Sequence, residues 1–194
     1  LRQRHPGQEG HRLLMRLGRG MSLLIGGARS GKSDLSVRLG QSWPGPVTFV
    51  ATATAGDSDM AQRIERHQDE RPAEWGLIES PLFGVDDADR LPTDELVILD
   101  CVTLLVANLM FDGLAEAEIT THISALAQSL EARQSPTVVI TNEVGLGIHP
   151  ESAMGREYRD LLGRANRSMA ARAESSMFVA AGKVFPLQDL DLTW

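Results

Sequence analysis

The sequence feature that most constrains the fold is an eight-residue run, GGARSGKS, at positions 26–33. It matches the phosphate-binding loop (P-loop) pattern G-x-x-x-x-G-K-[ST] in full. An apolar run, MSLLI at 21–25, precedes it, and a helical pattern follows from Lys32 to about Leu39. In such a strand–loop–helix unit, backbone N–H groups and the N-terminal end of the helix surround a phosphate. Lys32 is then expected to reach the β- and γ-phosphates, and Ser33 to ligate Mg²⁺.

The rest of the chain predicts an α/β fold, because short apolar runs alternate with helical patterns. Further strands are expected at 47–51, 77–78, 96–99, 137–141 and 177–181, and helices at 59–71, 103–110, 115–133 and 151–173. Pro72 ends the helix at 59–71, because the residue before a proline disfavours helical conformation. Strands that are apolar on both faces and separated by helices are typical of a parallel sheet covered on both sides. We therefore expect a single P-loop NTPase-like domain over residues 21–194, with a mostly parallel sheet and helices on both faces.

Composition and charge limit the classes of function. The first 20 residues carry five Arg and one Glu, a net of +4, which leaves −11 for the remainder of a chain whose net charge is −7. An acidic body argues against broad nucleic-acid binding. Residues 1–20 lack the apolar segment of a signal peptide and are expected to be a disordered extension or a sequence scar. No apolar run approaches the roughly 18 residues that cross a bilayer, and the one cysteine, Cys101, fits a reducing cytoplasm.

An acidic partner for the P-loop is expected at the end of a neighbouring strand. Asp100 follows the apolar run LVIL at 96–99 and is placed to hold Mg²⁺ directly or through water. The alternative is a solvated strand-end aspartate or the N-cap of the next helix. Cys101 is interpreted as a small packed residue rather than a nucleophile. These features indicate a nucleotide binder, a class that includes kinases, GTPases and ATPases.

The helix predicted at 59–71 carries one histidine between arginines. Arg63, His67 and Arg71 are spaced four apart and share one helix face. The stripe is either a solvated surface or a phosphate-facing surface that contains a nucleophile. In the second interpretation the arginines bind phosphate oxygens and disfavour protonation of His67, so that a ring nitrogen attacks phosphorus and forms a phosphoramidate. The spacing alone does not choose between the two.

Six motifs in a fixed order resemble one known family. They are GGARSGKS, ATAT at 51–54, RIERHQDERPAEW at 63–75, LDCVTLLVANLM at 99–110, TNEVGLGIHPES at 141–152 and YRDLLGRANRSMAARA at 158–173. Together they closely resemble the bifunctional adenosylcobinamide kinase / adenosylcobinamide-phosphate guanylyltransferase family of cobalamin biosynthesis. The resemblance runs from Met21 to about Gly182, and the tail after it is not strongly family-like.

The resemblance implies two reactions on a corrinoid. A nucleoside triphosphate, ATP or GTP, first phosphorylates the aminopropanol hydroxyl of adenosylcobinamide. GMP then passes from GTP to a histidine, with release of pyrophosphate, and from the histidine to adenosylcobinamide phosphate, which gives adenosylcobinamide-GDP. The family also implies a homotrimeric assembly, and Mg²⁺ is the cofactor expected from the P-loop.

The resemblance also implies site residues. His67 occupies the place of the guanylylated histidine, which favours its interpretation as the transfer nucleophile, with Lys32 as a second catalytic residue. The triphosphate site consists of Gly26, Gly27, Ala28, Arg29, Ser30, Gly31, Lys32 and Ser33, and a nucleotide-contacting turn consists of Ala51, Thr52 and Ala53. The guanine-nucleotide pocket consists of Gln68, Asp69, Glu70, Arg71 and Glu79. The metal ligands are Ser33 and Asp100. The run 142–147 and the residues Arg159, Arg164 and Asn166 are expected to pack the fold or to shape a corrinoid site, a sheet edge or a subunit contact.

Two further hypotheses stay open. One is a guanylyltransferase without the kinase step, which would still need the triphosphate site. The other is a P-loop regulator without covalent chemistry, in which His67 is an ordinary surface residue.

Overall fold

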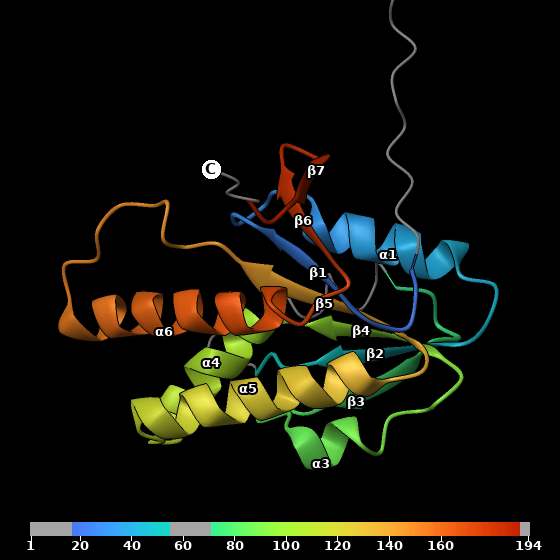
Figure 1. Ribbon diagram of the computed structural model, residues 1–194, viewed down its shortest axis with the longest axis horizontal. Helices are drawn as coiled ribbons and strands as arrows, with labels where there is room; N and C mark the ends of the chain where they lie inside the picture. Colours follow the sequence, from blue (N-terminus) through green and yellow to red (C-terminus); the bar gives the residue numbers. More distant parts are fainter. Residues whose placement is uncertain (1–16, 55–70, 191–194) are drawn as a thin grey trace, which may run out of the picture.

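A computed structural model of the protein describes residues 17–54 and 71–190. Seven strands form one sheet with the order β3-β2-β4-β5-β1-β6-β7 (Figure 1). The strands are β1 (Gly20–Gly26), β2 (Val47–Ala51), β3 (Gly76–Glu79), β4 (Leu96–Asp100), β5 (Pro136–Asn142), β6 (Ser175–Ala180) and β7 (Lys183–Leu187). The helices are α1 (Lys32–Ser42), α3 (Val85–Ala88), α4 (Val102–Phe111), α5 (Glu116–Ala132) and α6 (Ala153–Ala170).

The sheet is parallel except at one edge. The first six strands pair in parallel, and β7 returns antiparallel to β6. The strand that leads into the P-loop, β1, lies between β5 and β6. All the carboxyl ends of the parallel strands therefore meet at one edge of the sheet, which is the edge where α/β proteins bind ligands.

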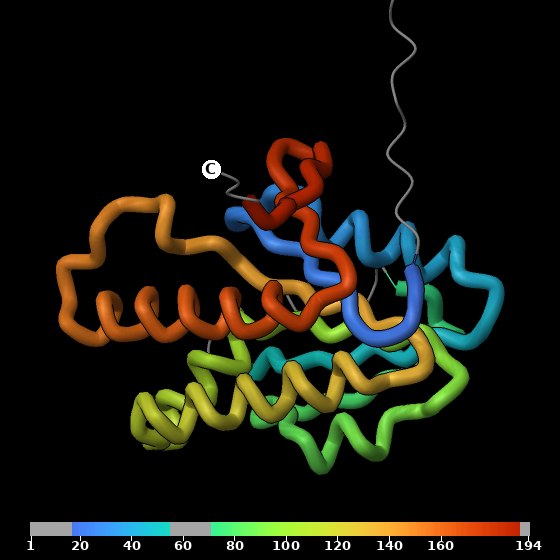
Figure 2. The backbone as a smooth tube through the Cα atoms, viewed as in Figure 1, coloured from blue at the N-terminus to red at the C-terminus, as the bar shows by residue number. Residues whose placement is uncertain are grey.

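Helices cover both faces, as the sequence predicts. On one face, α3, α4, α5 and α6 enclose a core that contains Leu99, Leu105 and Leu126, each without solvent exposure. On the other face, Leu35 and Leu39 of α1 pack over Ile98 and its neighbours. Figure 2 shows the sheet between these two layers. The apolar residues on both sides of each central strand explain why the sheet needs both layers.

The predicted strands are all confirmed, with ends that differ by one or two residues. Two elements were not predicted: the one-turn helix α3 and the strand β7. The sequence of β7, KVFPL, is mostly exposed and contains a proline, so it lacks the apolar pattern of a buried strand. The predicted helix at 59–71 lies outside the described residues except for Arg71. No helix among residues 17–54 and 71–190 has the length and apolar character of a membrane span.

Candidate active site

The P-loop lies between the carboxyl end of β1 and the first turn of α1. Gly26 closes β1, and a Cβ added there would lie 2.2 Å from the carbonyl oxygen of Val179, so a larger residue does not fit. Gly31 is the N-cap of α1 with a φ of 99°, a left-handed value that glycine adopts without steric cost. Glycine is therefore required at these two positions for different reasons. At position 26 the backbone of β6 is too close for a side chain, and at position 31 the start of α1 requires a positive φ.

The Lys32 ammonium lies inside this loop. Its Nζ donates to the carbonyl oxygens of Gly26 (2.9 Å) and Gly27 (2.8 Å) and to Ser30 Oγ (3.3 Å). Burial lowers the pKa of Lys32, whereas the acidic groups of Cys101 and Asp100 raise it. A positive charge is thus held where the loop would surround a phosphate, which fits the role predicted for Lys32.

Four predicted site residues gather at the ends of β3, β2 and β4. Ala51 of β2 is in register with Glu79 on one side and Asp100 on the other. Burial lowers the pKa of Arg71, and the charges of Asp100 and Glu79 raise it, so the guanidinium lies close to both carboxylates. The guanidinium carbon is also 4.2 Å from the centre of the Phe49 ring, in cation–π geometry. Arg71, Glu79 and Asp100 therefore belong to one cluster.

The residues predicted for Mg²⁺ supply oxygen donors. Ser33 follows Lys32 in α1, and Asp100 is near enough to Lys32 to shift its pKa, so hydroxyl and carboxylate share one edge of the sheet. Mg²⁺ commonly takes one or two carboxylates and completes its shell with phosphate oxygens and water. Residues 17–54 and 71–190 contain no cluster of three or more His, Cys, Asp and Glu side chains suited to a metal. The hydroxyl of Ser33 and the carboxylate of Asp100 therefore fit Mg²⁺ whose coordination shell is completed by phosphate oxygens of a nucleotide.

Thr52 lies in the turn predicted to contact nucleotide, but its side chain points into the protein. It has no solvent exposure, and its Oγ1 both donates to the carbonyl oxygen of Cys101 and accepts from the Cys101 N–H, each at 2.8 Å. Its own N–H donates to the carbonyl oxygen of Asp100 (3.0 Å). The side chain of Thr52 therefore holds the end of β4, whereas Ala51 and Ala53 of the same turn are partly exposed.

The interpretation of Cys101 as a packed residue is confirmed. The thiol is buried, and desolvation together with the charge of Asp100 raises its pKa to about 12. A thiol with such a high pKa carries almost no thiolate at neutral pH and is a poor nucleophile. Cys101 therefore supports the site by packing in the core and through its backbone bonds to Thr52, not as a nucleophile.

Asn108 is a contact residue that the sequence reasoning missed. From α4 its Nδ2 donates to the carbonyl oxygens of Thr52 (2.8 Å) and Pro81 (2.9 Å). It thus joins the segment after β2 to the turn after β3. A single amide inside the otherwise apolar stretch LLVANLM was the available signal, because a polar side chain in such a stretch needs buried partners.

A second network, around the predicted residue Asn166, fixes the end of β5. Asn166 of α6 accepts from Thr141 Oγ1 (2.6 Å) and donates to the carbonyl oxygen of Asn142 (2.9 Å). The Asn142 N–H donates to Thr103 Oγ1 at the start of α4 (2.7 Å). Asn166 is 5% exposed. Its role is therefore in packing, one of the alternatives expected from the sequence.

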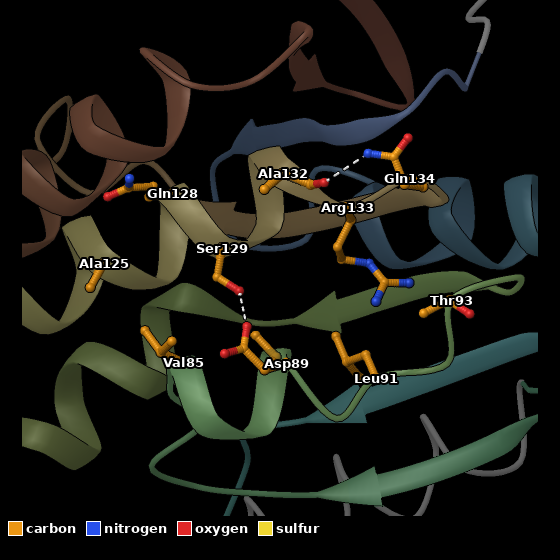
Figure 3. Close-up of a pocket in the computed structure, with 11 residues that line it drawn as sticks. Val85, Asp89, Leu91, Thr93, Ala125, Gln128, Ser129, Ala132, Arg133 and Gln134 are labelled. Atoms are coloured by element: carbon orange, nitrogen blue, oxygen red, sulfur yellow. Dashed lines mark hydrogen bonds between the residues drawn. The ribbon is translucent and has the colours of Figure 1, made fainter.

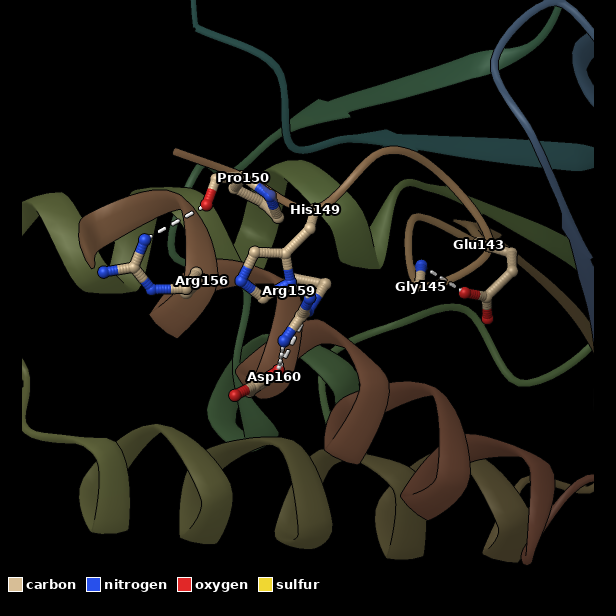
Figure 4. Close-up of polar contacts among 7 residues, drawn as sticks. All are labelled: Glu143, Gly145, His149, Pro150, Arg156, Arg159 and Asp160. Atoms are coloured by element: carbon tan, nitrogen blue, oxygen red, sulfur yellow. Dashed lines mark hydrogen bonds and ion pairs between the residues drawn. The ribbon is translucent and has the colours of Figure 1, made fainter. Parts of the chain in front are cut away.

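The loop after β5 has its own polar contacts (Figure 4). Arg159 donates to His149 Nδ1 (2.7 Å) and pairs with Asp160 (2.9 Å), and the Glu143 carboxylate accepts from the Gly145 N–H. Arg164, further along α6, pairs with Glu116 of α5. Arg159 and Arg164 therefore have partners within the chain.

The cavity in Figure 3 lies at the other end of the sheet. It has a volume of about 520 Å³ between α3 and α5, near the residues that lead into β4 and β5. Three of its polar side chains already have partners: Ser129 donates to Asp89 (2.9 Å), and Arg133 donates to Thr137 Oγ1 (3.0 Å) and the carbonyl oxygen of Pro92 (2.8 Å). This cavity is therefore separate from the P-loop edge.

Four predicted site residues, His67, Gln68, Asp69 and Glu70, lie outside the described residues. The structure describes the chain again from Arg71, which packs against the end of the sheet as described above. Their roles in catalysis and in guanine binding stay predictions.

Solved structures show the fold. A Pyrococcus horikoshii OT3 protein shares it with a TM-score of 0.56 at 7% identity, over 89% of this chain and 87% of that chain. An ATPase from the type III secretion system of pathogenic bacteria shares it with a TM-score of 0.52 at 12% identity, over 82% of this chain and 50% of that chain. At these identities the likeness concerns the P-loop NTPase fold alone, and it confirms the predicted fold class.

Sequence comparison is more specific. The chain is 38% identical over 156 residues to the "Bifunctional adenosylcobalamin biosynthesis protein CobU" of Escherichia coli K12, which covers 73% of this chain and 84% of that protein. It is 34% identical over 167 residues to the "Bifunctional adenosylcobalamin biosynthesis protein CobP" of Pseudomonas aeruginosa, which covers 86% of this chain and 96% of that protein.

A family model described as "Cobinamide kinase / cobinamide phosphate guanyltransferase" matches residues 22–187. The match continues to the end of β7, so the predicted end of the resemblance at about Gly182 is too early. The matched range contains the P-loop, the Arg71–Glu79–Asp100 cluster and the β6–β7 hairpin. The chain belongs to the cobinamide kinase / cobinamide phosphate guanyltransferase family.

Proposed function

We propose that this chain is a bifunctional adenosylcobinamide kinase and adenosylcobinamide-phosphate guanylyltransferase that uses one P-loop for both reactions. The observation that carries the proposal is the family match over residues 22–187, together with a complete P-loop that encloses the Lys32 ammonium. The relatives from Escherichia coli and Pseudomonas aeruginosa are both named as bifunctional.

The kinase reaction is a transfer of the γ-phosphoryl group. The aminopropanol hydroxyl oxygen of adenosylcobinamide attacks the γ-phosphorus and loses its proton to water, the bond from that phosphorus to the β,γ-bridging oxygen breaks, and the nucleoside diphosphate leaves. Lys32 and the loop N–H groups stabilise the charge on the phosphate oxygens. Ser33 and Asp100 would hold Mg²⁺, which adds further neutralisation of charge when it is bound. The triphosphate is ATP or GTP.

The guanylyl transfer proceeds in two displacements. A ring nitrogen of His67 attacks the α-phosphorus of GTP, and pyrophosphate leaves with the electrons of the broken P–O bond. A phosphate oxygen of adenosylcobinamide phosphate then attacks the same phosphorus, the P–N bond breaks, and His67 is restored. Arg71 and Glu79 contribute to the guanine-nucleotide pocket with Gln68, Asp69 and Glu70. The closeness of Arg71 to the Asp100 carboxylate supports a place near the phosphates.

The assembly and the compartment belong to the same proposal. We expect a homotrimer in the cytoplasm, with the corrinoid as the second substrate. Sedimentation analysis of the purified chain tests the trimer separately from the chemistry.

The decisive experiment labels GTP on its α-phosphate. The chain is mixed with this GTP and Mg²⁺ without corrinoid, denatured, and examined for label. We expect acid-labile, alkali-stable label on the wild type and on His122→Ala and His149→Ala, but not on His67→Ala. The two control histidines lie on α5 and in the loop after β5, bonded to Phe83 and Arg159. Label that persists in His67→Ala would overturn the assignment of the nucleophile.

The kinase half needs its own measurement. With γ-labelled ATP or GTP and adenosylcobinamide, label should reach the corrinoid with the wild type and be lost with Lys32→Ala. Guanylylation without corrinoid phosphorylation would favour the hypothesis of a guanylyltransferase that lacks the kinase step. The absence of both reactions in wild-type protein that binds GTP would favour the P-loop regulator.

A further inference from the structure

The turn between β6 and β7 touches the P-loop, and nothing in the proposed chemistry uses it. We propose that Gly182 in this turn is a positioning residue for phosphate binding, whose N–H fixes the orientation of the Ser30–Gly31 peptide of the P-loop. The inference rests on the proposed nucleotide site and adds a residue from the far end of the chain to it.

The contact follows from the sheet order. β6 pairs in parallel with β1, from Ser22 with Ser175 to Ile25 with Phe178, so both strands end at the same edge. The Gly182 N–H donates to the carbonyl oxygen of Ser30 at 2.9 Å. A Cβ added to Gly31 would lie 3.2 Å from the Cα of Gly182. In Figure 2 the hairpin, drawn in red, lies beside the blue segment that leads from β1 into α1.

The geometry of one peptide unit gives this contact its consequence. In a trans peptide the carbonyl group and the following N–H point in opposite directions within one plane. The Ser30 carbonyl is held toward the hairpin, so the Gly31 N–H points away from it. None of the hydrogen bonds found within residues 17–54 and 71–190 uses that N–H. It is left available beside the free N–H groups that begin α1.

The turn itself is well defined. Ala181 and Gly182 form a two-residue connection in which both have positive φ, 50° and 70°, the values that suit a tight hairpin. Ala181 is a non-glycine residue in the left-handed region, a conformation that persists only where surrounding structure requires it. The pairing of Ala180 with Lys183 supplies that requirement. The hairpin therefore presents the Gly182 N–H in one direction.

Without this donor, the Ser30–Gly31 peptide is free to rotate and to present its carbonyl oxygen to the phosphates. That orientation replaces an attractive contact with a repulsive one. The loss concerns the phosphates and not the base, so it should be the same for every ligand that carries a triphosphate.

The test removes the N–H and keeps a matched control. In Gly182→Pro the donor is absent and φ is fixed near −65°. Gly113→Pro is the control, because Gly113 also has a positive φ (89°), open space around an added Cβ, and one N–H bond, to Met110 (3.1 Å). Affinity is measured by calorimetry with Mg²⁺ and GTP, ATP or inorganic tripolyphosphate, and folding is followed by circular dichroism.

We expect Gly182→Pro to bind all three ligands about ten- to hundredfold more weakly, the worth of one charge-assisted hydrogen bond. Gly113→Pro should match the wild type in affinity, and Gly182→Ala, which keeps the N–H, should stay within about threefold of it. If Gly182→Pro does not fold, glycolic acid at position 182 removes the N–H alone, as an ester, and the same loss is expected.

Two results would overturn the inference: unchanged affinity when the N–H is removed, or a loss for GTP that tripolyphosphate does not share. The second would make the hairpin a base contact. Failure of wild-type protein to bind any of the three ligands would instead refute the proposed nucleotide site.

Discussion

The hydroxyl of Thr52 offers the clearest quantitative test of how the site is built. Thr52→Val preserves the shape of the side chain and replaces its hydroxyl with a methyl group. That oxygen takes part in two hydrogen bonds of 2.8 Å with the backbone of Cys101, and Thr52 has no solvent exposure. The substitution leaves the Cys101 N–H without its acceptor and the carbonyl oxygen without this donor.

The expected cost follows from these two bonds. A net contribution of about 1 kcal/mol per bond sets the lower limit, and the desolvation of groups left unpaired raises the sum, so we expect a loss of about 2–4 kcal/mol in the free energy of unfolding. For a chain of this size, that corresponds to a decrease of about 4–16 °C in Tm. The position of Asp100 should also relax, because the Thr52 hydroxyl no longer holds the neighbouring backbone of Cys101.

Urea unfolding of wild type, Thr52→Val and Thr120→Val measures the effect. Thr120 is the control because its hydroxyl bonds to the carbonyl oxygen of Glu116 on the exposed face of α5, where water replaces the bond. Its substitution should stay within about 0.5 kcal/mol of the wild type. A loss below about 0.5 kcal/mol in Thr52→Val, equal to the control, would refute the reasoning.

Three further predictions concern the fold around the site. Leu105 of α4 has no solvent exposure, so Leu105→Ala should lower the unfolding free energy by about 2–5 kcal/mol, measured by urea titration. Asn166→Ala removes the two side-chain hydrogen bonds that Asn166 makes at the end of β5 and should lower the unfolding free energy by about 1–3 kcal/mol. Gln128→Ala, at an exposed position, should change it little in the same assay. Burial raises the pKa of Cys101 and of Tyr158 to about 12. Folded protein therefore keeps these protons at pH values where unfolded protein loses them. The contribution of these two neutral groups to the free energy of unfolding is complete below about pH 9 and decreases as the pH rises to about 12. Unfolding curves across this range check the sign, and iodoacetamide should label Cys101 at pH 8.5 only after denaturation.

The strands were predictable because a strand that is buried on both faces requires a continuous run of apolar residues. LVIL at 96–99 and TVVIT at 137–141 are such runs, and both occupy the middle of the sheet. β7 was not predictable in this way. Its pairing with β6 depends on the tight turn at Ala181–Gly182, whose residues carry no asparagine–glycine or aspartate–glycine signal.

The site shows the same division. The P-loop is local, so its eight residues reveal themselves by spacing. Thr52 was predicted from the family resemblance of its turn, but whether its side chain faces a ligand or the protein depends on the distant Cys101. Asn108 and Gly182 act across the sheet, and contacts of this kind have no short-range pattern from which to predict them.

The position of β1 in the sheet has a consequence for how the chain reaches its native state. The strand is made first, yet its two neighbours, β5 and β6, come last among the parallel strands. Ser22 and Ser175, whose side chains bond to each other, are 153 residues apart. Such distant pairings slow folding, because closing the long intervening loop costs entropy before the contacts form. During synthesis on the ribosome, the P-loop emerges early. Strand β1 cannot pair with β5 and β6 until nearly the whole domain has been synthesised.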